Sequence, residues 1–303
     1  RRQRQMCIRD RANDEMMEIS QRVSPKLSQT SNNIFLNEKL LARVKSIYDK
    51  KEQLNLSTED AKLLEDLYES FKANGATLNK DDKEKYRKLS MDLSMLTLQF
   101  DQNALKDKNR FELLITDENE LSGLPESARD AAAMLAKSKD KNGWLFNLSA
   151  PSYIPFMRYS DKRDLREKMY REYMSVGNKG DEFDNKDIIK KIVNIRLEIA
   201  QLMGFKNYAE YALEHTMAKN SANVYKLLNQ LLEAYKPIAI NEYNAVEGFA
   251  LGTEKENITV MPWDWSYYSE KLRDIRFKVN DEMTRPYFEL SNVKKGVFGL
   301  APQ

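Results

Sequence analysis

The sequence predicts an all-α protein with a minor β component, and three observations lead to this fold class. Apolar residues recur at intervals of three and four along most of the 303 residues, which is the period of one helix face. Short polar residues stand three positions before Asp or Glu at several expected helix starts, a pattern typical of helix capping. The chain contains only 10 Gly and 8 Pro, too few for the frequent turns of a β-sandwich, barrel or propeller.

The first clear helix starts are expected at Ser57 and Asn79, each followed three positions later by an aspartate. A long helix is predicted over 80–105, because apolar residues follow one of its faces: Tyr86, Leu89, Leu93, Leu96 and Phe100. Further apolar residues lie on the adjoining flank: Met91, Met95 and Leu98. So wide an apolar face predicts burial against several neighbouring helices.

Three further helices are expected after residue 180. Asp184-x-x-Asp187 precedes a helix from Lys186, whose apolar face ends before Gly204, a candidate for the left-handed residue that follows a helix. Asn207-x-x-Glu210 marks another start in the same way. A last helix begins at Ser221, and Pro237 within it predicts a kink.

Two short segments are expected to be extended. Residues 143–148 (GWLFNL) have the composition of a strand, whereas 153–157 are confined by Pro151 and Pro155, which suit an edge strand or an irregular crossing. Any sheet is therefore predicted to be small.

A mild change of composition at 251–259 (LGTEKENIT) is the candidate junction between two lobes.

The first eleven residues, RRQRQMCIRDR, are expected to be foreign to the protein. They hold five Arg and one Asp and include Cys7, the one cysteine of the chain. Read back into codons, they look like a sequencing adapter, and no apolar stretch follows that would make them a secretory signal. Without them the net charge changes from +2 to −2, and no disulfide, Cys-ligated zinc or Cys nucleophile is expected.

Composition excludes two classes of partner. No apolar run approaches the ~18 residues of a membrane span, and the mean hydropathy is −0.70, so no membrane insertion is expected. The lysine-rich runs are interleaved with acidic or polar residues. Since the native part carries a net negative charge, no nucleic-acid partner is expected either.

His215 is the one histidine of the chain, which limits the hydrolytic chemistry available. A helical zinc site of the H-E-x-x-H type needs two histidines one turn apart, and no serine has the context of a Ser-His-Asp triad. We therefore interpret His215 as a residue near a helix C-terminus, where a positive charge is favoured. No catalytic residue and no metal ligand is assigned to the chain.

An aromatic cluster near the C-terminus is the candidate ligand-binding feature. Trp263, Tyr267 and Tyr268 belong to it, and such rings can line a peptide-binding channel because they are rigid and carry polar groups at their edges. The alternative is that they fill a core, which aromatic clusters more often do. Asp264 is expected to be the N-cap of a helix that begins at Trp265.

Several segments, taken together and in order, resemble one family. They are 149–157 (SAPSYIPFM), 197–211 (LEIAQLMGFKNYAEY), 216–219 (TMAK), 262–273 (PWDWSYYSEKLR), 285–288 (RPYF) and 296–298 (GVF). These resemble the thimet oligopeptidase family of zinc metallopeptidases, and within it most closely the bacterial peptidyl-dipeptidase branch. The resemblance extends over almost all of 12–303.

The resemblance implies a mostly helical, two-lobed protein with a deep, narrow channel for short unstructured peptides. Residues 12–251 are then expected to form a helical lobe of the channel wall, and 252–303 to begin the second, catalytic lobe. The family's zinc is held by an H-E-x-x-H helix and a later Glu, and all of these are expected beyond the end of this chain. The cofactor implied is zinc, bound by residues that this chain does not contain.

The function that follows is that of a fragment of a zinc-dependent oligopeptidase that releases C-terminal dipeptides from short peptides. Alone, the fragment is expected to lack catalysis, and the complete protein is expected to be a cytoplasmic monomer, with the periplasm as the alternative location. Two alternative functions stay open: a helical peptide-binding or scaffold protein without catalysis, and a helical nucleic-acid binder, which the charge disfavours.

Overall fold

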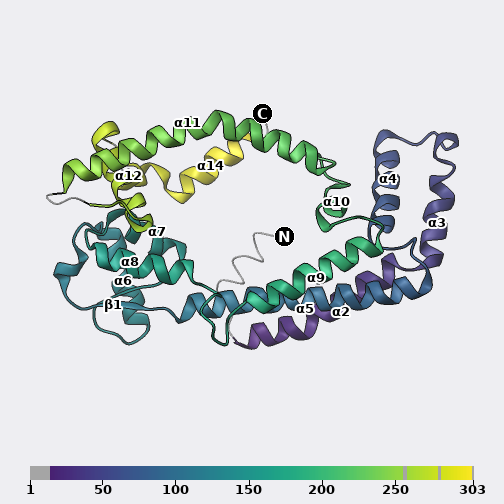
Figure 1. The fold of residues 1–303 in the computed structure, drawn as a ribbon, viewed down its shortest axis with the longest axis horizontal. Helices are drawn as coiled ribbons and strands as arrows, with labels where there is room; N and C mark the ends of the chain where they lie inside the picture. The colour runs from purple at the N-terminus through teal and green to yellow at the C-terminus, as the bar shows by residue number, and fades with distance from the viewer. Residues whose placement is uncertain (1–13, 255–257, 279–280, 302–303) are drawn as a thin grey trace. The chain divides into compact units, whose positions relative to one another are not determined.

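The described part of the chain is mostly helical, and the chain divides into two compact units. A computed structural model describes residues 14–254, 258–278 and 281–301 (Figure 1). Unit 1 consists of residues 1–106 and 177–230, and unit 2 consists of 107–176 and 231–303. A single two-stranded sheet is present among the described residues, so the predicted all-α class with a minor β component is confirmed. The predicted lobes, 12–251 and 252–303, stay a prediction, and residues 1–11 lie outside the described part.

The described residues of unit 1 form helices and no strand. They are α2 (Asp14–Phe35), α3 (Glu38–Tyr48), the 3-10 turn η1 (Lys51–Gln53), α4 (Thr58–Ala73), α9 (Lys186–Leu202), α10 (Tyr208–Leu213) and most of α5 (Lys80–Arg110). The last residues of α5 belong to unit 2. The first ten residues of α11 (Ser221–Thr253) belong to unit 1 and the rest to unit 2.

Unit 2 contains the sheet and the C-terminal helices. Its elements are β1 (Leu113–Ile115), η2 (Glu118–Leu121), α6 (Glu126–Ser138), β2 (Trp144–Phe146), α7 (Ala150–Tyr159), α8 (Arg163–Met174), α12 (Pro262–Phe277), α13 (Asp281–Thr284), η3 (Arg285–Phe288) and α14 (Leu290–Leu300). The strands are antiparallel, with Leu114 opposite Leu145. The extended segment predicted over 143–148 is thus confirmed as β2.

Capping side chains begin three of the helices as predicted. Ser57 Oγ accepts from the Asp60 amide at 3.1 Å, Asn79 Oδ1 from the Asp82 amide at 2.9 Å, and Asn207 Oδ1 from the Glu210 amide at 3.0 Å. Each bond satisfies a backbone N–H that has no partner within its own helix. The long helix predicted over 80–105 is α5, which continues five residues further.

The start of α9 differs from the expected cap. Asp184 Oδ1 accepts from the Lys186 amide at 2.9 Å, and the residue directly before the helix is Asn185. The buried Asn185 side chain does not cap α9 but donates to the Phe100 carbonyl at 3.1 Å and accepts from Asn103 Nδ2 at 3.1 Å. Asn185 therefore fastens the start of α9 to α5. At the other end, Gly204 has a φ of +86° and follows the helix as predicted.

The core of unit 1 lies where α5 meets α9. Tyr86 and Leu89 on α5 are buried with Leu36 and Ile199. By contrast, α2 lies along α5 through hydrogen-bonded polar side chains, which pair Gln21 with Gln102, Ser24 with Ser94 and Asn32 with Ser90. The face predicted to bury α5 against several neighbours is thus fully buried only in its first turns.

The prediction of an extended segment over 153–157 was wrong, because these residues belong to helix α7. Pro151 stands in the first turn of α7, where its missing N–H has no intrahelical partner to lose. Pro155 removes one further donor from a ten-residue helix. Burial of Phe156 and Met157 in the core of unit 2 compensates for that loss. Pro237 likewise lies inside the continuous helix α11.

Gly143 offers a test of the turn before β2. Its φ is +114°, and a Cβ there would lie 2.3 Å from the carbonyl oxygen of Ile115. We expect Gly143→Ala to lower the free energy of unfolding of unit 2 by about 2 kcal/mol or more. The measurement is urea unfolding followed by tryptophan fluorescence, since Trp144, Trp263 and Trp265 all lie in unit 2.

Gly248 is the matched control. It lies in α11 with open space around the position of an added Cβ, so Gly248→Ala should stabilise the helix by up to about 1 kcal/mol. If Gly143→Ala and Gly248→Ala changed the free energy of unfolding equally, the φ of Gly143 and its close approach to the Ile115 carbonyl oxygen would not be what requires glycine there.

Candidate functional site

The candidate site is built on the first turns of α12, where polar and aromatic side chains share one face. Asp264, Tyr267, Tyr268 and Lys271 follow each other at spacings of three, one and three, which brings them to the same side of a helix. The expectation that Asp264 is the N-cap was wrong. Met261 is the N-cap, and Asp264 is the third helical residue, whose Oδ2 accepts from the Met261 amide at 3.1 Å.

Asp264 is fully buried and is bound by two arginines from the start of α8. Arg166 Nη2 donates to Asp264 Oδ1 at 2.8 Å, and Arg163 Nη2 donates to Asp264 Oδ2 at 2.7 Å. Arg166 is 1% exposed and also donates to the Ser160 carbonyl at 2.7 Å and the Trp263 carbonyl at 3.3 Å. The two buried charges are therefore paired and hydrogen-bonded, as low-dielectric surroundings require.

The protonation of Asp264 follows from this pairing. Burial acts to raise the pKa of Asp264, but hydrogen bonds from Arg163, Arg166 and the Met261 amide outweigh burial, and the pKa lies below its ordinary value. The carboxylate thus stays charged at neutral pH. A group held in this way is a structural anion and is poorly suited to act as a general acid or base near pH 7.

A second carboxylate, Asp161, joins α12 to the loops of unit 2. Asp161 Oδ1 accepts from the Tyr267 hydroxyl at 2.7 Å and from Lys271 Nζ at 3.2 Å, and its Oδ2 accepts from Ser122 Oγ at 2.7 Å. The Arg166 guanidinium lies 4.0 Å from the centre of the Tyr267 ring. Burial and the hydrogen bond to Asp161 raise the pKa of Tyr267, so this phenol stays protonated.

The three predicted channel residues are all buried, and they fall into two clusters. Tyr267 and Tyr268 pack with Val246 and Ala250, and the Tyr268 hydroxyl donates to Glu254 Oε1 at 2.5 Å. Trp263 packs in the sheet-side core of unit 2, with Arg171 4.8 Å from its ring centre. Their exposed fractions are 6% for Trp263, 6% for Tyr267 and 2% for Tyr268. Contact of these rings with a substrate stays a prediction.

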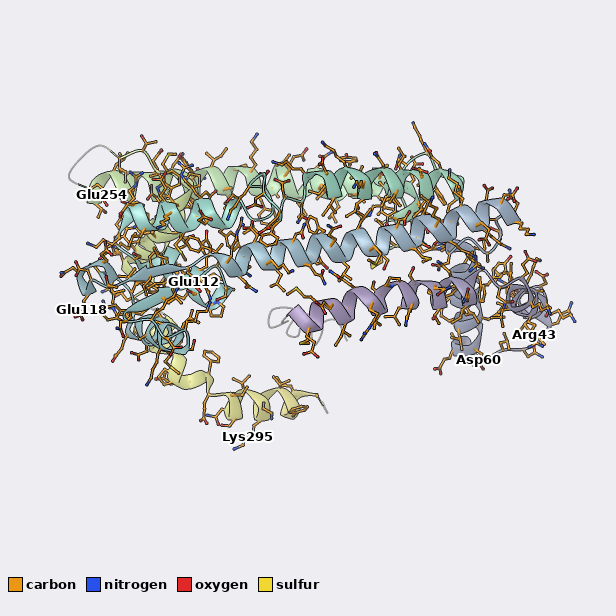
Figure 2. All side chains as sticks on the ribbon, turned by 90° about the horizontal axis from the view of Figure 1, so that it is seen from below. Arg43, Asp60, Glu112, Glu118, Glu254 and Lys295 are labelled. Carbon is orange, nitrogen blue, oxygen red and sulfur yellow. The ribbon has the colours of Figure 1, made fainter. Side chains whose placement is uncertain are left out.

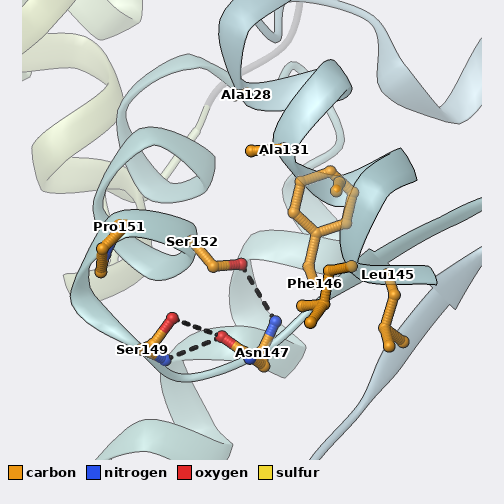
Figure 3. A pocket seen from close by; sticks show the side chains of 10 residues that line it. Ala128, Ala131, Leu145, Phe146, Asn147, Ser149, Pro151 and Ser152 are labelled. Atoms are coloured by element: carbon orange, nitrogen blue, oxygen red, sulfur yellow. Dashed lines mark hydrogen bonds between the residues drawn. The ribbon is translucent and has the colours of Figure 1, made fainter. Parts of the chain in front are cut away.

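A small cavity lies elsewhere in unit 2, between α6, β2 and α7 (Figure 3). Its volume is about 200 Å³, and alanine side chains such as Ala128 and Ala131 leave this space open. At one end Asn147 Oδ1 accepts from the Ser149 amide and hydroxyl, and Ser152 Oγ accepts from the Asn147 amide (Figure 3). Because these hydroxyls already bond within the chain, the cavity offers space for an apolar group but no nucleophile activated by a base.

The described residues do not fit a zinc site. His215 Nε2 lies 3.3 Å from Glu214 and 3.9 Å from Glu69 in an open cleft of unit 1, but no group of three His, Cys, Asp or Glu side chains suited to a metal occurs in the described part. Lys72 also pairs with Glu69 at 3.0 Å. His215 follows the end of α10, as its interpretation as a residue near a helix C-terminus predicts.

Sequence reasoning missed Arg163, Arg166 and Asp161, which carry most of the polar contacts of the site. In the sequence, Arg163 and Arg166 look like ordinary charges of an amphipathic helix. One signal was available: the two arginines are three positions apart and so share one helix face. Their partner Asp264 is about 100 residues away, and no local pattern connects the three.

Comparison with known proteins adds to this geometry. A family model described as Peptidase family M3 matches residues 156–303. Oligopeptidase A from Salmonella typhimurium is 34% identical over 291 residues, which are 94% of this chain and 42% of that protein. Dipeptidyl carboxypeptidase from Escherichia coli is 31% identical over 293 residues, 96% of this chain and 43% of that protein. A probable cytosolic oligopeptidase A from Arabidopsis thaliana is 36% identical over 267 residues, 85% of this chain and 38% of that protein.

These matches confirm the resemblance found in the sequence. The chain spans about two fifths of the length of the curated relatives it matches. The chain is 34% identical to oligopeptidase A and 31% identical to dipeptidyl carboxypeptidase. A difference this small does not show which of these two kinds of peptidase the chain resembles more. Asp161, Arg163, Arg166 and Asp264 all lie inside the residues that the family model matches.

Replacing the buried carboxylate tests the role of the α8–α12 network. We expect Asp264→Asn to lower the free energy of unfolding of unit 2 by about 3 kcal/mol at pH 7, because Arg166 would keep a buried charge without its partner. Asp187→Asn, at an exposed ion pair with Lys190, is the control and should change stability little.

The pairing of Asp264 with Arg163 and Arg166 also predicts that the stability of unit 2 depends on pH. Because the pKa of Asp264 is lowered in the folded chain, its stabilisation is present above the unfolded aspartate pKa of about 3.9 and is lost as the pH falls below that value. The stability difference between the wild type and Asp264→Asn should therefore shrink in this acid range. A difference that stays constant from pH 7 to pH 3 would show that the charge of Asp264 is not what stabilises unit 2.

Proposed function

We propose that this chain, whose residues 156–303 match the model of Peptidase family M3, is part of a zinc-dependent oligopeptidase that hydrolyses short peptides. The similarity to proteins named oligopeptidase A over 94% of the chain carries this proposal. Among the described residues, no group of three His, Cys, Asp or Glu side chains is suited to hold a metal ion. The proposal therefore assigns the zinc ligands and the general base to polypeptide outside these 303 residues, and the wall of a peptide channel to this chain.

The finer specificity we propose is the release of dipeptides from the C-terminus of the substrate. The relative named dipeptidyl carboxypeptidase supports it. Internal cleavage is the alternative, which fits the relatives named oligopeptidase A. Dipeptide release and internal cleavage differ in what the enzyme must bind. An enzyme that always cleaves two residues before the C-terminus must recognise the free C-terminal carboxylate of its substrate, whereas an enzyme that cleaves internal bonds need not.

Within this proposal Trp263, Tyr267 and Tyr268 contribute to the channel by holding its wall in place. Their rings are buried, and the hydrogen bonds of Tyr267 to Asp161 and of Tyr268 to Glu254 fix the orientation of α12. A direct contact with the peptide requires the channel to open onto these rings in the whole protein.

A cytoplasmic monomer is the proposed form of the whole protein. The Arabidopsis thaliana relative named as a probable cytosolic oligopeptidase A supports the location, and a periplasmic location is the alternative. Among the described residues, no helix combines the length and the apolar character that crossing a membrane requires.

Expression of the complete source gene, read through to its stop codon, tests the proposed activity. We expect the product to cleave a quenched fluorescent peptide, to lose this activity with a zinc chelator and to regain it with added zinc. The 303-residue chain alone should cleave nothing. A complete product that binds peptide without cleaving it, and that lacks H-E-x-x-H, would favour the alternative of a peptide-binding or scaffold protein.

Mass spectrometry of the products tests the specificity. A peptide with a free C-terminus should yield dipeptides, while the same peptide with an amidated C-terminus should be cleaved far more slowly. Equal cleavage of the two peptides at internal bonds would overturn dipeptide release and leave oligopeptide hydrolysis intact.

A further inference from the structure

The part of α11 that belongs to unit 2 begins with an exposed apolar surface. Every residue from 231 to 244 is exposed, and the apolar side chains among them include Leu231 at 42%, Leu232 at 59%, Tyr235 at 62% and Ile238 at 51%. At 100° per residue these four lie within about a third of the helix circumference. We call these four residues the bare face of α11.

The bare face continues into a face that is already covered. Val246 and Ala250 lie on the same side of α11, two to four turns further along, and are 5% and 0% exposed where they pack on Tyr267 and Tyr268 of α12. Between them and the bare face, the Tyr243 ring stacks on Trp265 with 5.8 Å between ring centres. The side of α11 that carries the bare face is therefore covered by α12 near the C-terminal end of the helix and is uncovered before it, with Glu242 between the two parts.

The opposite side of the same helix is mixed in character. Glu233 and Asn244 lie there together with Ile240, and all three are exposed. An exposed helix with a cluster of apolar side chains on one side is typical of a surface that packs on a neighbour. Helices of this length gain most of their stability from such packing, so the bare face needs a partner.

A second helix of unit 2 has the same property. Leu290, Val297 and Leu300 on α14 are 73%, 59% and 71% exposed, and α14, marked by Lys295, stands apart from the other helices of unit 2 in Figure 2. Two uncovered apolar helices in one unit exceed the scattered apolar residues that are ordinary on a protein surface.

We propose that the bare face of α11 is the docking surface for the remaining polypeptide of an M3 peptidase, the part of the relatives that this chain does not match. This inference rests on the proposed function. The match covers 42% of oligopeptidase A from Salmonella typhimurium, so more than half of such a protein is available to pack on unit 2. The occupant extends the layer that α12 begins and presents apolar side chains to Leu232 and Tyr235.

Cysteine labelling tests the docking surface, because Cys7 is the one cysteine of the 303-residue chain. In a Cys7→Ser background, Leu232→Cys is placed in the 303-residue chain and in the complete product of the source gene. We expect labelling of Leu232→Cys by a maleimide to be about tenfold or more slower in the complete product. Glu233→Cys, the neighbour on the opposite side of the helix, and Leu63→Cys, a 65% exposed leucine on α4, are the controls and should label rapidly in both.

Three outcomes would overturn the inference. Equal labelling of Leu232→Cys and Glu233→Cys in the complete product would mean that nothing docks on the bare face. Protection that appears in the 303-residue chain alone and rises with its concentration would identify a second copy as the occupant. A source gene that encodes nothing further would remove the proposed occupant. Protection in a complete product that cleaves no peptide would instead uphold the docking surface and contradict the proposed activity.

Discussion

The ion pairs between the buried Asp264 carboxylate and the two arginines of α8 are the constraint on which unit 2 depends. A charge in the core is stable only when every partner is in place, so Asp264 fixes the distance and the rotation of α12 against α8. The Tyr267 ring then lies over Arg166, and its hydroxyl reaches Asp161. Through Ser122, Asp161 extends the same network to the turn after η2. Three segments that are far apart in the sequence are thus held in one arrangement.

Helices were predictable from the sequence wherever a local rule determines them. Ser57, Asn79 and Asn207 cap helices as expected because the donor and the acceptor are three residues apart. Pro151 and Pro155 misled the prediction for 153–157, since a proline fits both the first turn of a helix and an edge strand, and only the burial of Phe156 decides between them. Asp264 was assigned a local capping role because its decisive partners, Arg163 and Arg166, lie about 100 residues earlier.

The residues that indicate function differ in how much the sequence alone says about them. The motifs that resemble the peptidase family could be recognised without a structure, because they depend on residue order alone. The function of Trp263, Tyr267 and Tyr268 could not be derived in this way, since an aromatic cluster is compatible with a binding channel but more often fills a core. Their burial in the described chain favours the packing role, while the similarity to peptidases of family M3 supports the proposal that they line a channel.

The division of the chain into interleaved units has a consequence for its synthesis. Each unit is assembled from two stretches, and residues 177–230 of unit 1 separate the two stretches of unit 2. Arg166 leaves the ribosome 98 residues before Asp264, a delay of about 5 to 20 seconds at ordinary elongation rates. Throughout that interval α8 has no anionic partner from α12, and the pocket for Trp263 is vacant. Unit 2 can therefore complete its core only after all of unit 1 has been translated.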